Sequence, residues 1–278
     1  MDALSDCLQF LIKRQHRSTT GYLCQIYSNM MEGLNGNSKR SSTDDVEMHG
    51  SILVLEEMLR HTGFFMLPRF EEVCEVIFSL TSHPKALIRL EIVRLCPRLA
   101  RACPSVFQRK FLAIGLDFLI QTAANPSLTK NSVIDLRPSS YVSLGQLSLA
   151  MKHTENSVLG SAASAMCLDS LHKRLPDIFS LVQAGLTSTS PQKHIGEVNI
   201  TRAALNCGAN VVKALGEHAL PYVEQLLDSI YKSGLSDDLI ESLRSIASSM
   251  PSKQVSSLVA GQCRFSLLFL IMSCLLYT

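Results

Sequence analysis

The chain has 278 residues, a formal net charge of +2, and a composition that is 46% hydrophobic, 18% charged and 6% aromatic, with no Trp. A net charge this close to zero is too small to predict binding to nucleic acid or to a membrane surface. The nine cysteines are scattered without a C-x-x-C pair, which excludes a disulfide-rich scaffold and is typical of reduced thiols. The apolar run at residues 7–12 is too short for a secretory signal peptide.

Prolines divide the chain into helical stretches. Five of them follow one amphipathic stretch and precede another: Pro68, Pro104, Pro176, Pro221 and Pro251. Proline suits the first position of a helix, where its missing N–H would have no intrahelical partner. Units of about 40 residues are typical of HEAT and armadillo arrays. We therefore predict an all-α fold, a HEAT/armadillo-like α-solenoid of about five antiparallel helix pairs.

Residues 1–43 are predicted to form an N-terminal helix and a polar linker, followed by the solenoid over residues 44–262. The first helix of the array is expected to run from Asp44 to about Arg60, with Gly63 ending it in the left-handed conformation. Its partner is expected to begin near Pro68, because apolar residues then recur with helical spacing as far as residue 80.

The second helix pair is predicted to begin at Lys85. Pro97 falls inside the first helix of this pair and should kink it. Pro104 is expected to open the partner helix over residues 107–120, and residues 121–137 lack periodicity and are predicted to be a loop.

The third pair is the least regular. We expect one helix at 141–151 and another, opened by Leu175 and Pro176, at 178–184. The Ser/Ala-rich stretch at 156–171 is compatible with either an extra helix or an inserted loop.

The fourth pair restores the pattern, with helices at 198–215 and from Pro221 to about residue 231. Gly234 is expected to stop the second helix, and Ser236 with two following aspartates to start another.

The C-terminal residues differ in character from the array. Phe265–Tyr277 is a run of 13 residues without a formal charge, whereas a membrane-spanning helix needs about 20. We therefore predict a hydrophobic tail at 263–278 that is not part of the array, and we do not expect a membrane anchor.

No pattern of catalytic residues is present. Neither phosphate-binding glycine loop, G-x-x-x-x-G-K-[ST] or G-x-G-x-x-G, occurs, and the glycines are interpreted as helix caps. The histidines lack the H-x-x-x-H and H-E-x-x-H spacings of metal sites. Cys96 and Cys103 are seven residues apart, which favours two buried neutral thiols over a zinc or redox pair. We predict no catalytic residue, no cofactor and no metal site.

One cluster of charge stands out. Arg94, Arg98 and Arg101 follow one another at helical spacing, with Arg109 and Lys110 nearby. Such a stripe is suited to an acidic partner segment or to nucleic acid, but a solvated helix face with Glu91 one turn away explains it as well. The three arginines are our candidate partner-binding residues.

Several segments, in this order, resemble the N-terminal HEAT region of the target-of-rapamycin protein kinases. The segment that carries the resemblance best is Ala86–Ala100, in which Pro97 is followed by Arg-Leu-Ala. The other segments are Met48–Arg60, Arg69–Val73, Leu175–Ile178, Val212–Gly216 and Ser233–Ser236 leading to Pro251. Together they cover about residues 44–262.

The resemblance implies a fragment or shortened product that carries part of the helical scaffold and not the kinase domain. It further implies a protein-interaction scaffold in assembly of the target-of-rapamycin complex and in growth signalling. The implied partners are the WD40-bearing regulatory subunit and the rest of the kinase. The implied location is the cytoplasm, with the nucleus or the periphery of endomembranes as further locations. No nucleic acid is expected as a partner.

Three other classes of protein remain as alternatives. The first is an unrelated HEAT or armadillo adaptor for nuclear transport or phosphatase assembly, the second an enzyme in its own right, and the third a protein attached to a membrane through its C-terminal run.

Overall fold

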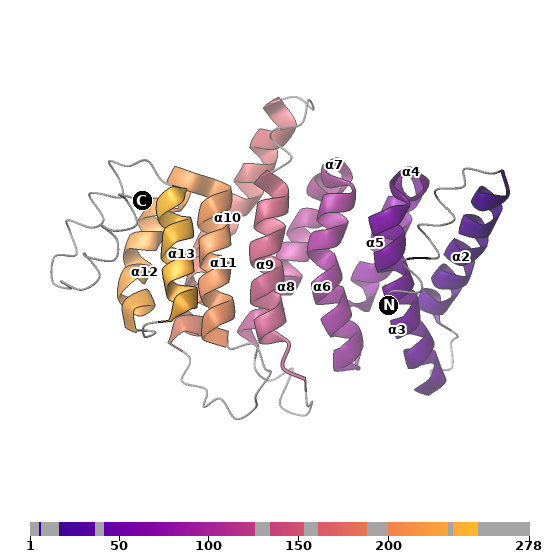
Figure 1. Ribbon diagram of the computed structural model, residues 1–278, viewed down its shortest axis with the longest axis horizontal. Helices are drawn as coiled ribbons and strands as arrows, with labels where there is room; N and C mark the ends of the chain where they lie inside the picture. Colours follow the sequence, from indigo (N-terminus) through magenta and orange to yellow (C-terminus); the bar gives the residue numbers. More distant parts are fainter. Residues whose placement is uncertain are drawn as a thin grey trace. The chain divides into compact units, whose positions relative to one another are not determined.

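The structure is a computed structural model that describes residues 6, 17–36, 42–125, 134–152, 161–187, 200–232 and 236–249. Every regular element in these residues is a helix (Figure 1). The chain divides into two compact units, Met1–Leu136 and Arg137–Thr278. The predicted domain limits at residues 43 and 262 stay predictions, and the tail at 263–278 lies outside the described residues.

The first unit is built on α3 and α6, with shorter helical segments beside them. Its segments are α2 (Arg17–Asn35), α3 (Ser42–His61), α4 (Gly63–Met66), η1 (Leu67–Arg69), α5 (Phe70–Ser79), η2 (Leu80–Ser82), α6 (Ala86–Ala102), α7 (Pro104–Val106), the π-helical η3 (Phe107–Phe111) and α8 (Leu112–Ala124). Gly36 ends α2 with a φ of 61°, a conformation that glycine adopts without a steric penalty.

The helix α6 is the central element of this unit. Ile92, Cys96 and Leu99 are fully buried, and α6 contacts α3, α5, α7 and α8. Pro97 lies inside α6, as predicted, and is buried, while the kink at Pro97 stays a prediction. A helix that is apolar over most of its circumference is stable only when neighbours cover it on several sides, which explains the position of α6.

Equivalent helices of consecutive pairs, α3 and α6, run parallel to each other. Three side-chain contacts follow the same order along both helices: Asp45 with Lys85 just before α6, His49 with Glu91, and Glu56 with Arg98. The partners are about 40 residues apart in the chain, which is the repeat length of HEAT-type arrays. The predicted fold class, an all-α solenoid of packed helix pairs, is confirmed, whereas the number of pairs stays a prediction.

The second unit has the same kind of pairing. Its segments are α9 (Arg137–Lys152), α10 (Ser161–Leu186), α11 (Ile200–Leu215), η5 (Gly216–Ala219), α12 (Leu220–Lys232) and α13 (Asp237–Ser248). The helix α11 packs against α9, α10 and α13. A Cβ atom on Gly145 of α9 would lie 3.1 Å from the Cα atom of Cys207, so α9 and α11 approach each other with only a glycine between their backbones.

Most of the predicted helix starts are confirmed. Pro68 lies in η1 directly before α5, Pro104 begins α7, and Pro221 is the second residue of α12. The Ser236 hydroxyl accepts a hydrogen bond from the N–H of Leu239 at 3.1 Å, which caps α13 as expected. Pro251 and Gly234 lie outside the described residues.

The prediction that Pro176 starts a helix is wrong. Pro176 lies inside α10, which is continuous from Ser161 to Leu186. The physical reason is the apolar face: Leu171, Leu175 and Ile178 are buried with helical spacing on both sides of the proline. The Ser/Ala-rich stretch is therefore helical from Ser161 onward, and residues 156–160 lie outside the described residues.

Three further predictions need correction. Gly63 does not adopt the left-handed conformation but begins α4. Thr62 instead closes the last turn of α3, because its hydroxyl donates a hydrogen bond to the Met58 carbonyl at 2.6 Å. The loop expected at 121–137 is shorter, because α8 continues to Ala124. Several glycines, such as Gly145, lie within helices where a neighbouring helix is close, rather than at helix ends.

Candidate functional site: a charged seam between two helices

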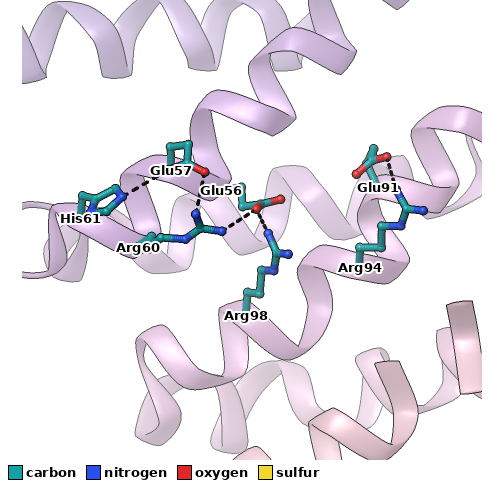
Figure 2. Close-up of polar contacts among 7 residues, drawn as sticks. All are labelled: Glu56, Glu57, Arg60, His61, Glu91, Arg94 and Arg98. Carbon is teal, nitrogen blue, oxygen red and sulfur yellow. Dashed lines mark hydrogen bonds and ion pairs between the residues drawn. The ribbon is translucent and has the colours of Figure 1, made fainter. Parts of the chain in front are cut away.

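Two of the three predicted arginines, Arg94 and Arg98, lie along a line of charged residues between α3 and α6, which we call the charged seam. It consists of Glu56, Glu57, Arg60, His61, Glu91, Arg94 and Arg98 (Figure 2). Because α3 and α6 are parallel helices of consecutive pairs, residues of one helix reach partners at the same level of the other. The charged seam thus joins two repeat units.

The carboxylates of the charged seam are buried. The side chains of Glu56, Glu57 and Glu91 are 9%, 2% and 9% exposed. An ionised carboxylate is costly to bury unless cations or hydrogen-bond donors surround it. Each of these three therefore needs a cationic partner inside the fold.

The cationic partners come from both helices. Arg60 donates to Glu56 at 3.1 Å and pairs with Glu57 at 3.1 Å, while His61 Nε2 lies 3.3 Å from Glu57. Arg98 crosses from α6 to pair with Glu56, so Figure 2 shows one carboxylate between two guanidinium groups.

Further along α6, Arg94 donates a hydrogen bond to Glu91 at 3.0 Å, and His49 Nε2 of α3 lies 4.0 Å from the same carboxylate. Every buried carboxylate of the charged seam therefore has at least one cationic partner.

The guanidinium groups, in contrast, reach the solvent. The side chains of Arg60, Arg94 and Arg98 are 51%, 52% and 39% exposed. Arg101 is exposed one turn beyond Arg98, and burial together with the Arg101 charge lowers the pKa of Arg98. Arginine still stays protonated at any physiological pH. The surface of the charged seam therefore presents cations, with the carboxylates beneath them.

The sequence pattern identified Arg94, Arg98 and Arg101 but missed two buried carboxylates: Glu56, which pairs with Arg98 and Arg60, and Glu57, which pairs with Arg60. Their spacing to Arg60, three and four residues, is an ordinary surface pattern, and only the packing of α3 on α6 shows that the carboxylates are buried. That the stripe binds a partner stays a prediction.

The second helices of the helix pairs, around 70–80, 107–120 and 221–231, are further candidates for contact with a partner. Within the first unit, these helices carry exposed apolar side chains and exposed charged side chains. Ile114 of α8 is 48% exposed, and Lys110 of η3 pairs with Glu71 of α5 across two consecutive second helices. Glu75 of α5 is also exposed.

Four of the described cysteines are buried, whereas Cys24 is partly exposed. Cys74, Cys96, Cys103 and Cys207 are buried and unbridged. Burial raises the pKa of Cys96 and of Cys207 to about 12, which suppresses the reactive thiolate form. Among the described residues no three of His, Cys, Asp and Glu are grouped as a metal site would require.

The second unit encloses a small apolar cavity between α10, α11, α12 and α13. Its volume is about 10 Å³, and its lining includes Val182, Gly208 and Val212. A cavity of this size holds at most one water molecule, so it is a packing defect and not a ligand site. None of the described helices has the length and hydropathy needed to cross a membrane.

Comparison with known proteins gives three similar kinases. The serine/threonine-protein kinase TOR of Arabidopsis thaliana is 29% identical over 252 residues, and that of Oryza sativa subsp. japonica is 31% identical over 254 residues. Both matches cover 91% of this chain and 9% of the kinase. The serine/threonine-protein kinase tor1 of Schizosaccharomyces pombe is 27% identical over 119 residues, 43% of this chain and 5% of that kinase.

No protein-family model matches the chain. The chain spans about 9% of the length of the plant kinases, and its matched stretch does not include a kinase domain.

Proposed function

Since this chain is related to a stretch of the TOR serine/threonine-protein kinases, as its sequence predicted, we propose that it is a protein-interaction scaffold in assembly of the TOR complex. The observation that carries the proposal is the similarity over 91% of the chain to both plant kinases. In this proposal the chain binds the WD40-bearing regulatory subunit and the remainder of the kinase, and through them takes part in growth signalling. It acts in the cytoplasm, in the nucleus, or on endomembranes through its partners.

The architecture supports a role in binding. Parallel stacking of equivalent helices, as in α3 on α6, exposes a long row of side chains to a partner, and repeat arrays generally bind proteins in this way. The residues that contact the partner are proposed to lie on the second helices, where Ile114 is an exposed apolar side chain on α8. An apolar side chain surrounded by polar ones is a common anchor of protein interfaces.

The proposal is tested by affinity capture from cells that express a TOR kinase. The tagged 278-residue chain should recover the WD40-bearing subunit and the kinase. Ile114→Asp should reduce the recovery several-fold, because it places a charge in the proposed contact. Val46→Asp is the matched control: Val46 is 72% exposed but lies on α3, a first helix, and its substitution should leave recovery unchanged.

Two results would contradict the proposal. Capture of neither subunit by the unsubstituted chain would remove the role in the complex. Capture of a nuclear-transport or phosphatase component in their place would favour the adaptor alternative.

A further inference from the structure

We infer that the exposed arginines of the charged seam form a docking site for an acidic protein segment in an extended conformation. The site consists of Arg94 and Arg98 of α6, with Arg60 of α3 beside them. The inference rests on the proposed function only in assigning the occupant to a protein partner, and its test does not require TOR complex assembly.

The first argument is the number of unused donors. Arg94 contacts Glu91, and Arg98 contacts Glu56, through Nη1 alone. Among the described residues neither arginine has a further ion pair or hydrogen bond, and the two side chains are 52% and 39% exposed. The Nε–Nη2 edge of a guanidinium presents two parallel N–H groups that match the two oxygens of a carboxylate.

The second argument is preorganisation. A free arginine loses side-chain entropy when it binds a ligand, whereas Arg94 and Arg98 are already held by Glu91 and Glu56. The glutamates are 9% exposed, so an incoming acidic group meets the guanidinium groups before it meets the buried carboxylates. The internal pairs thus hold the cations in position and leave one edge of each for a partner.

The third argument is spacing. Four residues of α-helix separate Arg94 from Arg98, a rise of about 6 Å. Alternate residues of an extended chain are about 6.6 Å apart and point to the same side. An extended segment with acidic residues at every second position therefore matches the two arginines in register.

The charge of the site favours a protein segment over nucleic acid. Affinity for a nucleic acid backbone grows with the number of phosphates that Lys and Arg neutralise, and two or three arginines neutralise few of them. The carboxylates beneath the arginines and the formal net charge of +2 also keep the long-range potential low. A short acidic segment, held by a few directional contacts, is the occupant that this surface fits.

The test is fluorescence polarisation with the complete chain and a labelled peptide of alternating Asp and Gly residues. We expect binding that weakens on addition of salt and that is lost when Asn replaces Asp in the peptide. Arg94→Gln should weaken binding by roughly three- to tenfold through loss of a charge-assisted contact, and far-UV circular dichroism verifies the fold of the variant. The His49 imidazole still lies 4.0 Å from Glu91 after this substitution, so that carboxylate keeps a polar neighbour on α3.

Two further variants make the test specific. Arg174→Gln removes an arginine of similar exposure, 41%, with a similar i,i+3 carboxylate partner in the second unit, and should leave binding unchanged. Arg94→Lys keeps the charge but not the paired N–H groups and should bind with intermediate strength.

The inference is overturned if Arg174→Gln weakens binding as much as Arg94→Gln, if Arg94→Lys binds fully, or if the peptide does not bind. Tighter binding of a single-stranded oligonucleotide with the same number of charges would likewise overturn the choice of a protein occupant. None of these four outcomes bears on capture of the TOR complex subunits, so the two proposals fail separately.

Discussion

Replacing Glu56 by glutamine tests whether the charged seam stabilises the junction between consecutive repeats. Glu56 accepts a hydrogen bond from Arg60 within α3 and pairs with Arg98 of α6. Glutamine has nearly the same size and keeps one carbonyl acceptor, so the substitution removes the charge and leaves the packing intact.

The expected loss follows from the exposure of the three side chains. Removing one member of a fully buried ion pair costs about 3–5 kcal/mol, and a solvent-exposed pair contributes about 0–1 kcal/mol. The Glu56 carboxylate is 9% exposed, but Arg60 and Arg98 are 51% and 39% exposed, so water can solvate both guanidinium groups once the charge is gone. We therefore expect Glu56→Gln to lower the free energy of unfolding by about 1–2 kcal/mol, between the two limits.

The chain offers a matched control in the same unit. Glu71 and Lys110 also join two consecutive helix pairs, but their side chains are 44% and 45% exposed. Glu71→Gln should therefore cost less than about 0.5 kcal/mol. Urea unfolding followed by far-UV circular dichroism compares the two variants with the unsubstituted chain. Equal losses for both variants, or a loss below about 0.5 kcal/mol for Glu56→Gln, would refute the reasoning from burial.

Three further predictions concern the rest of the fold. Gly208→Ala should raise the free energy of unfolding by about 0.5–1 kcal/mol, because Gly208 lies within a helix and its new Cβ would meet Val182 at an ordinary distance of 3.4 Å. Gly185→Ala should lower the free energy of unfolding by about 1–3 kcal/mol, because its Cβ would lie 2.8 Å from Oη of Tyr141. Urea unfolding that ranks the two variants in the opposite order would contradict this reasoning from packing. Iodoacetamide at pH 8 should label Cys96 only after unfolding, since the thiol is buried and burial raises its pKa to about 12, and mass spectrometry of the native chain would reveal any earlier labelling. Burial also raises the pKa of Tyr141 to about 12 from an ordinary 10.0, and that of Cys96 to about 12 from an ordinary 9.0. Both groups keep their protons to a higher pH in the folded than in the unfolded chain, so their contribution to the free energy of unfolding is complete below about pH 9 and is lost as the pH rises to about 12. Equal free energies of unfolding at pH 8 and pH 11 would contradict this prediction.

Sequence reasoning succeeded where the signal is local. Pro104 and Pro221 mark helix starts because a proline lacks the N–H that the first turn cannot use, and this effect depends on no distant residue. The cap at Ser236 is equally local, since its hydroxyl accepts from an N–H three residues further on.

Sequence reasoning failed where tertiary packing overrides the local conformational preference of a residue. Pro176 is tolerated inside α10 because buried residues on both sides keep one apolar face continuous, a benefit that only the neighbouring helices provide. Gly63 was expected to cap α3, but Thr62 already satisfies the end of that helix through its own side chain.

The candidate site was recognised only in part for the same reason. The spacing of Arg94 and Arg98 indicated one helix face, but the burial of Glu56 depends on a helix about 40 residues away. Without that contact the stripe is indistinguishable from a solvated surface, and the carboxylates that position it carry no recognisable motif.

The position of Arg60 has a consequence for how the chain is synthesised. Glu56 leaves the ribosome 42 residues before Arg98, a wait of about 2–8 s at usual rates of translation. Arg60, only four residues after Glu56 on the same helix, reaches that carboxylate at once. Once α3 is helical, Glu56 therefore has a cationic partner before Arg98 is synthesised, and Arg98 adds to this pair when the next repeat docks.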